Sequence, residues 1–396
     1  MFIPRRLSDR IKRLLRHFPA LILTGARQSG KTTLLKVLFP HYRYVSLDLP
    51  SKAEQAENSP EEFLAEYGTP LIVDEIQYAP GFFRHLKSTI DADRARNGRF
   101  ILTGSQKFPL MKHVSDSLAG RCAVLELENL ALAEMTASLN LKSSKEDLLR
   151  LITTGQFPAL WKDPDVPIYD YYSSYLATYL ERDVRQIMNI VSLRDFERFI
   201  RILAFRNGSM LNKTEVAKEV GVSVKAIGDW ISILHASGQI MLLEPWFSNF
   251  GKRVVKTPKL YFSDTGLLCF LLGLDKSSLL TSPFLGSVWE TFLYAEIRKV
   301  NQWKERPANI WYYRDQRARE VDFLIETGGF LHFVESKWSE TPRETDAKVI
   351  ETISKELEES KLQWRPGKRI ILAPISSSYI LKNGIRVMGQ EDIPSI

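Results

Sequence analysis

The chain has 396 residues, 44% of them hydrophobic and 26% charged, which is the composition of a soluble globular protein with two to four domains. The net charge of +7 permits a nucleic-acid partner without requiring one. The two cysteines, Cys122 and Cys269, are too far apart in sequence for a zinc motif or a disulfide framework, and no apolar run approaches the roughly 18 residues of a membrane-spanning helix. These features predict a cytoplasmic protein.

The N-terminal segment is basic and lacks the apolar region and cleavage site of a signal peptide. Residues 5–18 resemble an amphipathic helix whose apolar face carries Ile11, Leu14, Leu15 and Phe18. Such a helix packs on a neighbouring domain or lies on a membrane surface, and its length and context favour packing.

Residues 20–35 form an apolar run, a glycine-bounded loop and a helix, around which the first domain is predicted to fold. The loop reads GARQSGKT over residues 25–32 and fits G-x-x-x-x-G-K-[ST] at every fixed position. Gly25 and Gly30 let backbone N–H groups turn toward a phosphate, and Lys31 adds positive charge there. The Thr32 hydroxyl is a suitable ligand for Mg²⁺.

Two carboxylates end the next buried strand, residues 71–73, in the run LIVDEIQ. A buried strand that ends in Asp74 and Glu75 has little structural reason to do so, because unpaired buried charge is costly. Beside a phosphate loop, Asp74 would complete the Mg²⁺ shell and Glu75 would polarise the attacking water. The alternative is a solvent-exposed strand end.

The strand predicted over residues 100–102 runs into TGSQ, which places Ser105 or Gln106 at the ligand edge of a parallel sheet. Either side chain is a candidate to sense the γ-phosphate or orient water. Arg121 precedes the next apolar run, residues 122–127. It is either an arginine finger supplied to a neighbouring subunit or a salt-bridged surface residue, and the sequence favours neither.

The motifs GARQSGKT, LIVDEIQ, ILTGSQ and LAGR, in this order, resemble a widespread prokaryotic family of AAA-type ATPases with a C-terminal domain of unclear function. The resemblance spans essentially the whole chain. It implies a Walker A loop, a Walker B pair at Asp74 and Glu75, a sensor at Ser105 or Gln106, and a finger at Arg121. It also implies ATP and Mg²⁺ as cofactors, with ATP held by Gly25, Ala26, Arg27, Gln28, Ser29, Gly30, Lys31, Thr32 and Thr33.

The middle of the chain alternates helical patterns, and residues 131–200 are predicted to form a helical lid. Its closely spaced tyrosines fit a core or an interface better than a surface for stacking nucleic-acid bases. The sequence leaves open what Arg182 and Asp183 do.

Residues 201–265 predict a winged helix-turn-helix: a helix from Thr214, a turn at 221–223, a second helix to about Ser237, and a strand pair. The second helix carries little positive charge, with Lys225 and His235 against Asp229. The expected wing is more basic, with Lys252, Arg253, Lys256 and Lys259. DNA binding and a purely structural role therefore both remain.

The last domain, residues 266–396, contains a predicted hairpin in which a Gly328-Gly329 turn pairs Thr327 with Phe330. In that register Asp322 lies opposite Glu335, and Lys337 shares their face. Two carboxylates and a lysine in one patch are typical of metal-dependent phosphodiester cleavage.

With Glu290 on the preceding helix, this pattern resembles the PD-(D/E)xK nuclease superfamily, although Val321 stands where a proline is common. Asp322 and Glu335 would bind Mg²⁺, with Lys337 positioning water and Glu290 beside the metal. The alternative is a solvated patch held by salt bridges.

The predicted fold is thus α/β: a P-loop AAA-type domain over residues 1–130, the lid, the winged helix and a restriction-endonuclease-like domain. Two functions follow. The first is an ATPase that acts on DNA and carries a nuclease. The second is a nucleotide-gated switch whose nuclease-like domain binds DNA or protein without cleaving. In both, we expect a homo-oligomer and no membrane association.

Overall fold

The computed structural model describes residues 2–105, 117–139, 141, 144–163, 165–179, 192–246, 257–359 and 364–396. The candidate residues Gln106, Arg182, Asp183, Lys252, Arg253 and Lys256 lie outside these ranges. The chain divides into two compact units. Unit 1 comprises Met1–Leu130, Phe157–Lys162 and Ala236–Gly238, and unit 2 comprises Ala131–Gln156, Asp163–His235 and Gln239–Ile396.

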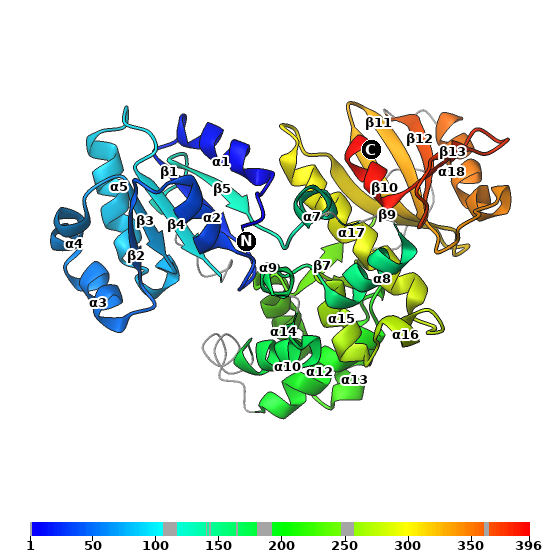
Figure 1. Ribbon diagram of the computed structural model, residues 1–396, viewed down its shortest axis with the longest axis horizontal. Helices are drawn as coiled ribbons and strands as arrows, with labels where there is room; N and C mark the ends of the chain where they lie inside the picture. Colours follow the sequence, from blue (N-terminus) through cyan, green and yellow to red (C-terminus); the bar gives the residue numbers. More distant parts are fainter. Residues whose placement is uncertain are drawn as a thin grey trace. The chain divides into compact units, whose positions relative to one another are not determined.

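Unit 1 is built on a parallel five-stranded sheet of order β2-β3-β4-β1-β5 (Figure 1, blue to cyan). Its central strands are continuous apolar runs, and every residue of β1 and β4 is buried. Parallel strands covered on both faces have this composition, so the predicted parallel sheet is confirmed. The strands are β1 Ala20–Thr24, β2 Arg43–Ser46, β3 Leu71–Asp74, β4 Phe100–Gly104 and β5 Cys122–Glu126.

Helices cover both faces of this sheet. α1 and α2 share one apolar cluster with the sheet, and α3, α4 and α5 share the other. The predicted N-terminal helix is α1, whose Leu7, Ile11 and Leu15 are buried in the first cluster, which confirms the packing role. The helices of unit 1 are α1 Leu7–Leu15, α2 Lys31–Leu38, α3 Pro50–Asn58, α4 Pro60–Tyr67, η1 Ile76–Tyr78, α5 Phe82–Ala92 and α9 Pro158–Lys162.

The segment between β2 and β3 forms two helices, α3 and α4, separated at Ser59. Pro60 lacks a backbone N–H and disfavours helical geometry at the residue before it, and Ser59 has φ −134°. Pro60 instead begins α4, where a missing N–H costs nothing.

The N-terminal half of unit 2 contains small helices and a three-stranded antiparallel sheet of order β6-β8-β7. On α10, Tyr172, Tyr175 and Tyr179 are buried, so the tyrosines serve as core, as predicted. These elements are α7 Leu132–Leu139, α8 Lys145–Thr154, α10 Ile168–Tyr179, α12 Leu193–Phe205, β6 Ser209–Met210, α13 Lys213–Val220, α14 Val224–Ala236, β7 Ile240–Leu243, β8 Lys259–Phe262, α15 Thr265–Leu272 and α16 Lys276–Leu279.

Two helices and a turn lie where the helix-turn-helix pattern predicts them. The Asn212 side chain caps α13 by accepting from the N–H groups of Thr214 and Glu215. Gly221 ends this helix at φ +88°, a left-handed conformation that favours glycine, and α14 begins three residues later. The predicted helices and the strand pair β7 and β8 are confirmed as elements.

A six-stranded mixed sheet forms the C-terminal half of unit 2, in the order β13-β14-β12-β11-β10-β9. β10 and β11 are the predicted hairpin, with Thr327 opposite Phe330 and Phe323 opposite Val334, so the predicted register is confirmed. The elements are α17 Leu285–Trp303, β9 Asn309–Arg314, β10 Glu320–Thr327, β11 Phe330–Ser336, η3 Glu344–Ala347, α18 Lys348–Glu358, β12 Arg365–Leu372, β13 Tyr379–Ile380, β14 Arg386–Met388 and η4 Gln390–Ser395. Among the described helices, none combines the length and the apolar character needed to cross a bilayer.

Candidate functional site

The loop between β1 and α2 requires glycine at both glycine positions of its motif, Gly25 and Gly30. Gly25 has φ +144°, and a Cβ there would collide with the carbonyl oxygen of Leu127. Gly30 has φ +93° and immediately precedes the first residue of α2. The loop therefore turns tightly and presents the free N–H groups of a helix start, which is the geometry that binds phosphate.

Lys31 turns back into this loop. Its side chain is largely buried, and Nζ donates to the carbonyl oxygens of Gly25 and Ala26, at 2.9 Å each. The hydroxyl of Ser29 is buried and has no hydrogen-bond partner among the described residues. An ammonium and an unused hydroxyl inside one glycine-bounded loop are groups that a phosphate can engage.

Asp74 at the end of β3 accepts hydrogen bonds from three hydroxyl groups. Thr32 and Tyr44 both donate to Oδ2, at 2.7 Å each, and Thr103 donates to Oδ1. Burial, together with the Asp74 carboxylate, raises the pKa of Tyr44, so this phenol stays protonated as a donor. The contact joins the predicted magnesium ligands Thr32 and Asp74 directly.

Glu75 adopts a left-handed backbone conformation, with φ +54° and ψ +48°. A non-glycine residue in this region carries strain of order 1–3 kcal/mol, which is common at functional sites. Its Oε2 accepts from the Ser105 hydroxyl at 3.1 Å and from the Gln77 amide. Ser105, predicted as a sensor, therefore contacts Glu75, and the Glu75 carboxylate is held at the end of the sheet beside Asp74.

Arg121 forms a bidentate ion pair within its own unit. Its Nε and Nη2 donate to the two carboxylate oxygens of Asp91 on α5, at 2.8 and 2.9 Å. The Arg121 guanidinium holds the pKa of Asp91 near 2. This is the salt-bridged surface arginine that the sequence left open, and a finger role requires Arg121 to leave Asp91.

The residues of unit 1 fit ATP and Mg²⁺. Gly25 provides a cradle that a Cβ would fill, and Lys31 lies inside it. Thr32 and Asp74 offer a hydroxyl and a carboxylate side by side, a hard oxygen set suited to Mg²⁺.

The second candidate group lies in unit 2, where Glu290 of α17, Asp322 of β10 and Glu335 of β11 come together. Oδ2 of Asp322 accepts from the backbone N–H and the hydroxyl of Ser336, at 2.8 and 2.7 Å. Lys337 donates to Oε1 of Glu335 at 2.9 Å. The hairpin register thus brings the predicted residues together, each with a polar partner.

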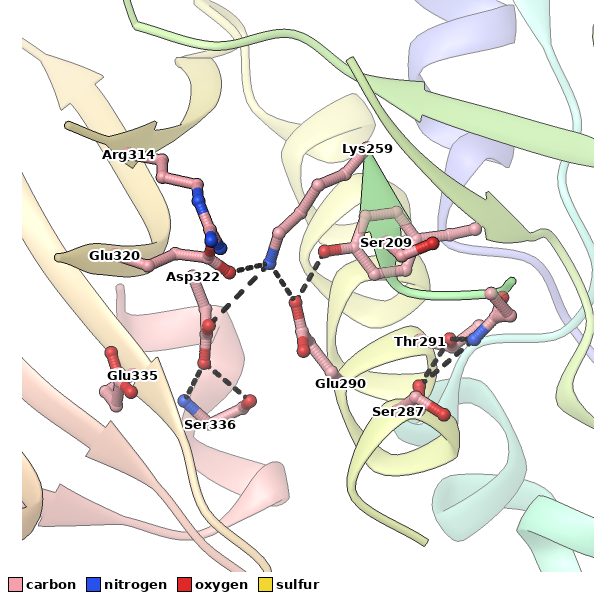
Figure 2. A network of polar contacts seen from close by, with 12 residues as sticks. Ser209, Lys259, Ser287, Glu290, Thr291, Arg314, Glu320, Asp322, Glu335 and Ser336 are labelled. Atoms are coloured by element: carbon pink, nitrogen blue, oxygen red, sulfur yellow. Dashed lines mark hydrogen bonds and ion pairs between the residues drawn. The ribbon is translucent and has the colours of Figure 1, made fainter. Parts of the chain in front are cut away.

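Lys259 is in this group, so the expectation that it adds to the basic surface of the wing is wrong. It is the first residue of β8 and only 3% of its side chain is exposed. Figure 2 shows its Nζ between Glu290 on one side and Glu320 and Asp322 on the other. The distances from Nζ to the nearest carboxylate oxygens of these residues are 2.9, 2.5 and 3.9 Å, respectively. We call Lys259, Glu290, Glu320 and Asp322 the carboxylate cluster.

The carboxylate cluster does not fit a metal ion. Within the described ranges, no group of three or more His, Cys, Asp or Glu side chains has an arrangement that would hold one. Oδ2 of Asp322 and Oε1 of Glu335 already accept hydrogen bonds, and the Lys259 ammonium lies between Glu290 and Asp322.

Glu335 gives unit 2 a pH dependence. Burial and the Asp322 charge raise the pKa of Glu335 from 4.5 to about 8. Because the folded state holds this proton more tightly, the stability from Glu335 is fully present below about pH 4.5 and is lost as the pH rises through about 8. We expect Glu335→Gln to flatten the fall in melting temperature between these pH values. Equal slopes for the variant and the wild type in thermal melts would contradict this.

Two mycobacterial proteins match most of the chain. The uncharacterized protein Rv2008c of Mycobacterium tuberculosis is 30% identical over 346 residues, which cover 86% of this chain and 76% of that protein. The uncharacterized protein Mb2031c of Mycobacterium bovis matches with the same values. The chain belongs to the family of these proteins.

Protein-family models divide the chain further. A model described as "AAA domain" matches residues 17–136, so this part of the chain is an AAA-type P-loop domain. Two models of domains of unknown function match residues 145–278 (DUF8612) and 285–391 (DUF4143).

Solved structures show looser likenesses. The Walker-type ATPase PABY2304 of Pyrococcus abyssi covers 68% of this chain and 96% of its own, with 14% identity and a TM-score of 0.48. The RuvB branch migration motor of Thermotoga maritima covers 61% of this chain and 90% of its own, with 15% identity and a TM-score of 0.32.

Several side chains that position the P-loop site could not be identified from the sequence motifs. Arg5 is buried and donates to the carbonyl oxygens of Ser29, Glu128 and Asn129, at 2.9, 2.6 and 3.0 Å, which fixes the loop from outside. Tyr44 and Thr103 reach Asp74 from the neighbouring strands β2 and β4. Both strands carry hydroxyl side chains in the sequence, but only the strand order makes Tyr44 and Thr103 neighbours of Asp74.

Proposed function

We propose that this chain binds ATP with Mg²⁺ at the β1–α2 loop and hydrolyses it. The observation that carries the proposal is the 2.7 Å hydrogen bond from the Thr32 hydroxyl to Asp74, beside a buried Lys31 ammonium. A hydroxyl–carboxylate pair suited to Mg²⁺ and a buried ammonium at the end of a parallel sheet, where such sheets bind their ligands, support this proposal. The AAA-domain match supports the same function.

Each residue of the site has a distinct part in the proposed reaction. The loop N–H groups and Lys31 bind the phosphate chain, and Thr32 and Asp74 would hold Mg²⁺. When bound, Mg²⁺ neutralises charge on the phosphate oxygens. The Glu75 carboxylate, oriented by Ser105 and Gln77, accepts a hydrogen bond from the attacking water.

The proposed role of Thr32 as a magnesium ligand is tested by Thr32→Val, which removes the hydroxyl and keeps the side-chain shape. We expect Mg²⁺ to raise ATP affinity in the wild type and to raise it roughly tenfold less in the variant, because one ligand is lost. Calorimetric titration of ATP with and without Mg²⁺ measures both. Thr89→Val is the control, since that hydroxyl donates only within α5. An unchanged Mg²⁺ effect in Thr32→Val would contradict the assignment.

We also propose that the chain forms a homo-oligomer, in which Arg121 of one subunit reaches the nucleotide bound by its neighbour. Support comes from the exposed position of its ion pair, which a partner could exchange. ATP turnover per chain should then rise with protein concentration in the wild type and not in Arg121→Ala. If turnover per chain is independent of concentration in both the wild type and the variant, Arg121 serves only as the ion-pair partner of Asp91.

We further propose that the family member acts as a nucleotide-gated DNA-binding or protein-binding switch in the cytoplasm. The order α12, β6, α13, α14, β7, β8 supports a winged helix, because three helices interleaved with a three-stranded sheet have that topology. The mixed sheet with α17 and the β10–β11 hairpin supports a nuclease-like fold for the C-terminal half. The unpaired Cys122 and Cys269 support a reducing compartment.

Cleavage of DNA is the second candidate function. The composition of the carboxylate cluster disfavours it. Glu290, Asp322 and Glu335 lie together, but the Lys259 ammonium pairs with Glu290 and lies 3.9 Å from Asp322. We expect no nicking of plasmid or linear duplex DNA with Mg²⁺ or Mn²⁺, with or without ATP. Cutting that disappears in Lys337→Ala would overturn this expectation and restore the nuclease.

A further inference from the structure

The carboxylate cluster contains its own cation. Lys259 Nζ lies 2.9 Å from Glu290 Oε1, 2.5 Å from Glu320 Oε1 and 3.9 Å from Asp322 Oδ1. The three acids come from α17 and β10, whereas the lysine comes from β8, at least 31 positions earlier in sequence. One ammonium thus joins carboxylates that would otherwise repel one another in a buried setting.

Backbone pairing and burial hold Lys259 in place. Its backbone is paired on both sides in the three-stranded sheet, with Met210 on β6 and Leu243 on β7. Its side chain is 3% exposed and therefore cannot reach solvent without opening the sheet. Burial alone would lower the pKa of Lys259, but the charges of Glu290, Asp322 and Glu320 outweigh it and raise the pKa, so the ammonium stays charged.

One oxygen of each acid has a further partner that competes with a metal. Tyr261 donates to the same Glu290 oxygen at 2.5 Å, and Arg314 pairs with Oε2 of Glu320 at 2.5 Å. Oδ2 of Asp322 accepts twice from Ser336. A divalent ion needs oxygens at about 2.0–2.6 Å, and it would lie within about 4 Å of a buried positive charge, which is strongly unfavourable.

We propose that the Lys259 ammonium is the resident cation of the carboxylate cluster: it excludes divalent metal from the wild-type chain, and its removal converts the cluster into a metal-binding site. This inference gives the reason for the absence of cleavage proposed above. It is independent of ATP hydrolysis, which takes place in unit 1.

The test is Mn²⁺ binding to the full chain without nucleotide, measured by the loss of the free-ion signal in electron paramagnetic resonance. All proteins carry Asp74→Asn, which removes the magnesium ligand of unit 1. We expect no saturable binding with Lys259 present. We expect Lys259→Met to bind one Mn²⁺ per chain at least roughly tenfold more tightly, and Glu290→Gln to abolish that gain.

Lys337→Met is the matched control. It also removes a lysine that pairs with a buried acid nearby, but this lysine is 37% exposed and its partner Glu335 is not a member of the carboxylate cluster. It should gain no Mn²⁺ binding. Circular dichroism establishes that each variant is folded, and Mn²⁺ should raise the melting temperature of Lys259→Met alone.

Two results would overturn the proposal. One is Mn²⁺ binding with Lys259 present that disappears in Asp322→Asn, and this result needs no Lys259 variant to fold. The other is a folded Lys259→Met that binds no Mn²⁺. Neither result bears on ATP hydrolysis, and metal binding in the wild type without DNA cutting would overturn this inference while leaving the switch proposal intact.

Discussion

Lys31→Ala should lose ATP binding by about 100-fold or more. The Lys31 ammonium lies in the β1–α2 loop at 2.9 Å from two carbonyl oxygens, and a phosphate offers it stronger, charge-assisted partners. Two such bonds, at about 1.5–3 kcal/mol each, account for a loss of this size. Calorimetric titration with ATP and Mg²⁺ measures the affinity directly.

The control for this variant is Lys12→Ala, which removes an exposed lysine from α1. Its ATP affinity should remain close to that of the wild type. Because Lys31 also donates to two carbonyl oxygens of the loop, thermal melts must show that Lys31→Ala is folded. If a folded Lys31→Ala variant binds ATP as the wild type does, the β1–α2 loop is not the ATP-binding site.

Glu75→Gln should reduce ATP hydrolysis by about 100- to 1,000-fold while ATP binding is retained. The carboxylate is needed to accept a hydrogen bond from water, and the amide is a poor replacement of nearly the same shape. Phosphate release gives the rate, and titration with ATP gives the affinity. Glu61→Gln, an exposed position on α4, is the control and should retain full turnover.

Two outcomes separate the possible roles of Glu75. A fall in both rate and affinity would show that its left-handed backbone and its bonds to Ser105 and Gln77 serve mainly to build the site. An unchanged rate would exclude Glu75 as the group that orients water. Only a lower rate with retained affinity agrees with the proposed reaction.

The sequence predicted well those features that depend on neighbouring residues. The loop of residues 25–32 and the carboxylates after β3 are local motifs, so spacing alone identifies them. The β10–β11 register followed from the Gly328-Gly329 turn, because a two-residue turn fixes every pair along the ladder. The helices α13 and α14 followed from the turn predicted at residues 221–223, and Gly221 ends α13 in the structure.

Contacts between distant segments could not be predicted in this way. Lys259 looked like part of a basic surface run, and only the sheet β6-β8-β7 carries it into the carboxylate cluster. Tyr44 reaches Asp74 only because β2 lies beside β3. The charge of a residue is readable from sequence, but its partner depends on the packing of strands that are far apart along the chain.

ATP hydrolysis by this chain is tested by phosphate release from ATP by the wild type, measured with Mg²⁺ and with EDTA, alongside Lys31→Ala. We expect steady turnover with Mg²⁺ that is absent in EDTA and in the variant. No turnover by the folded wild type at any protein concentration, or equal turnover by Lys31→Ala, would contradict it.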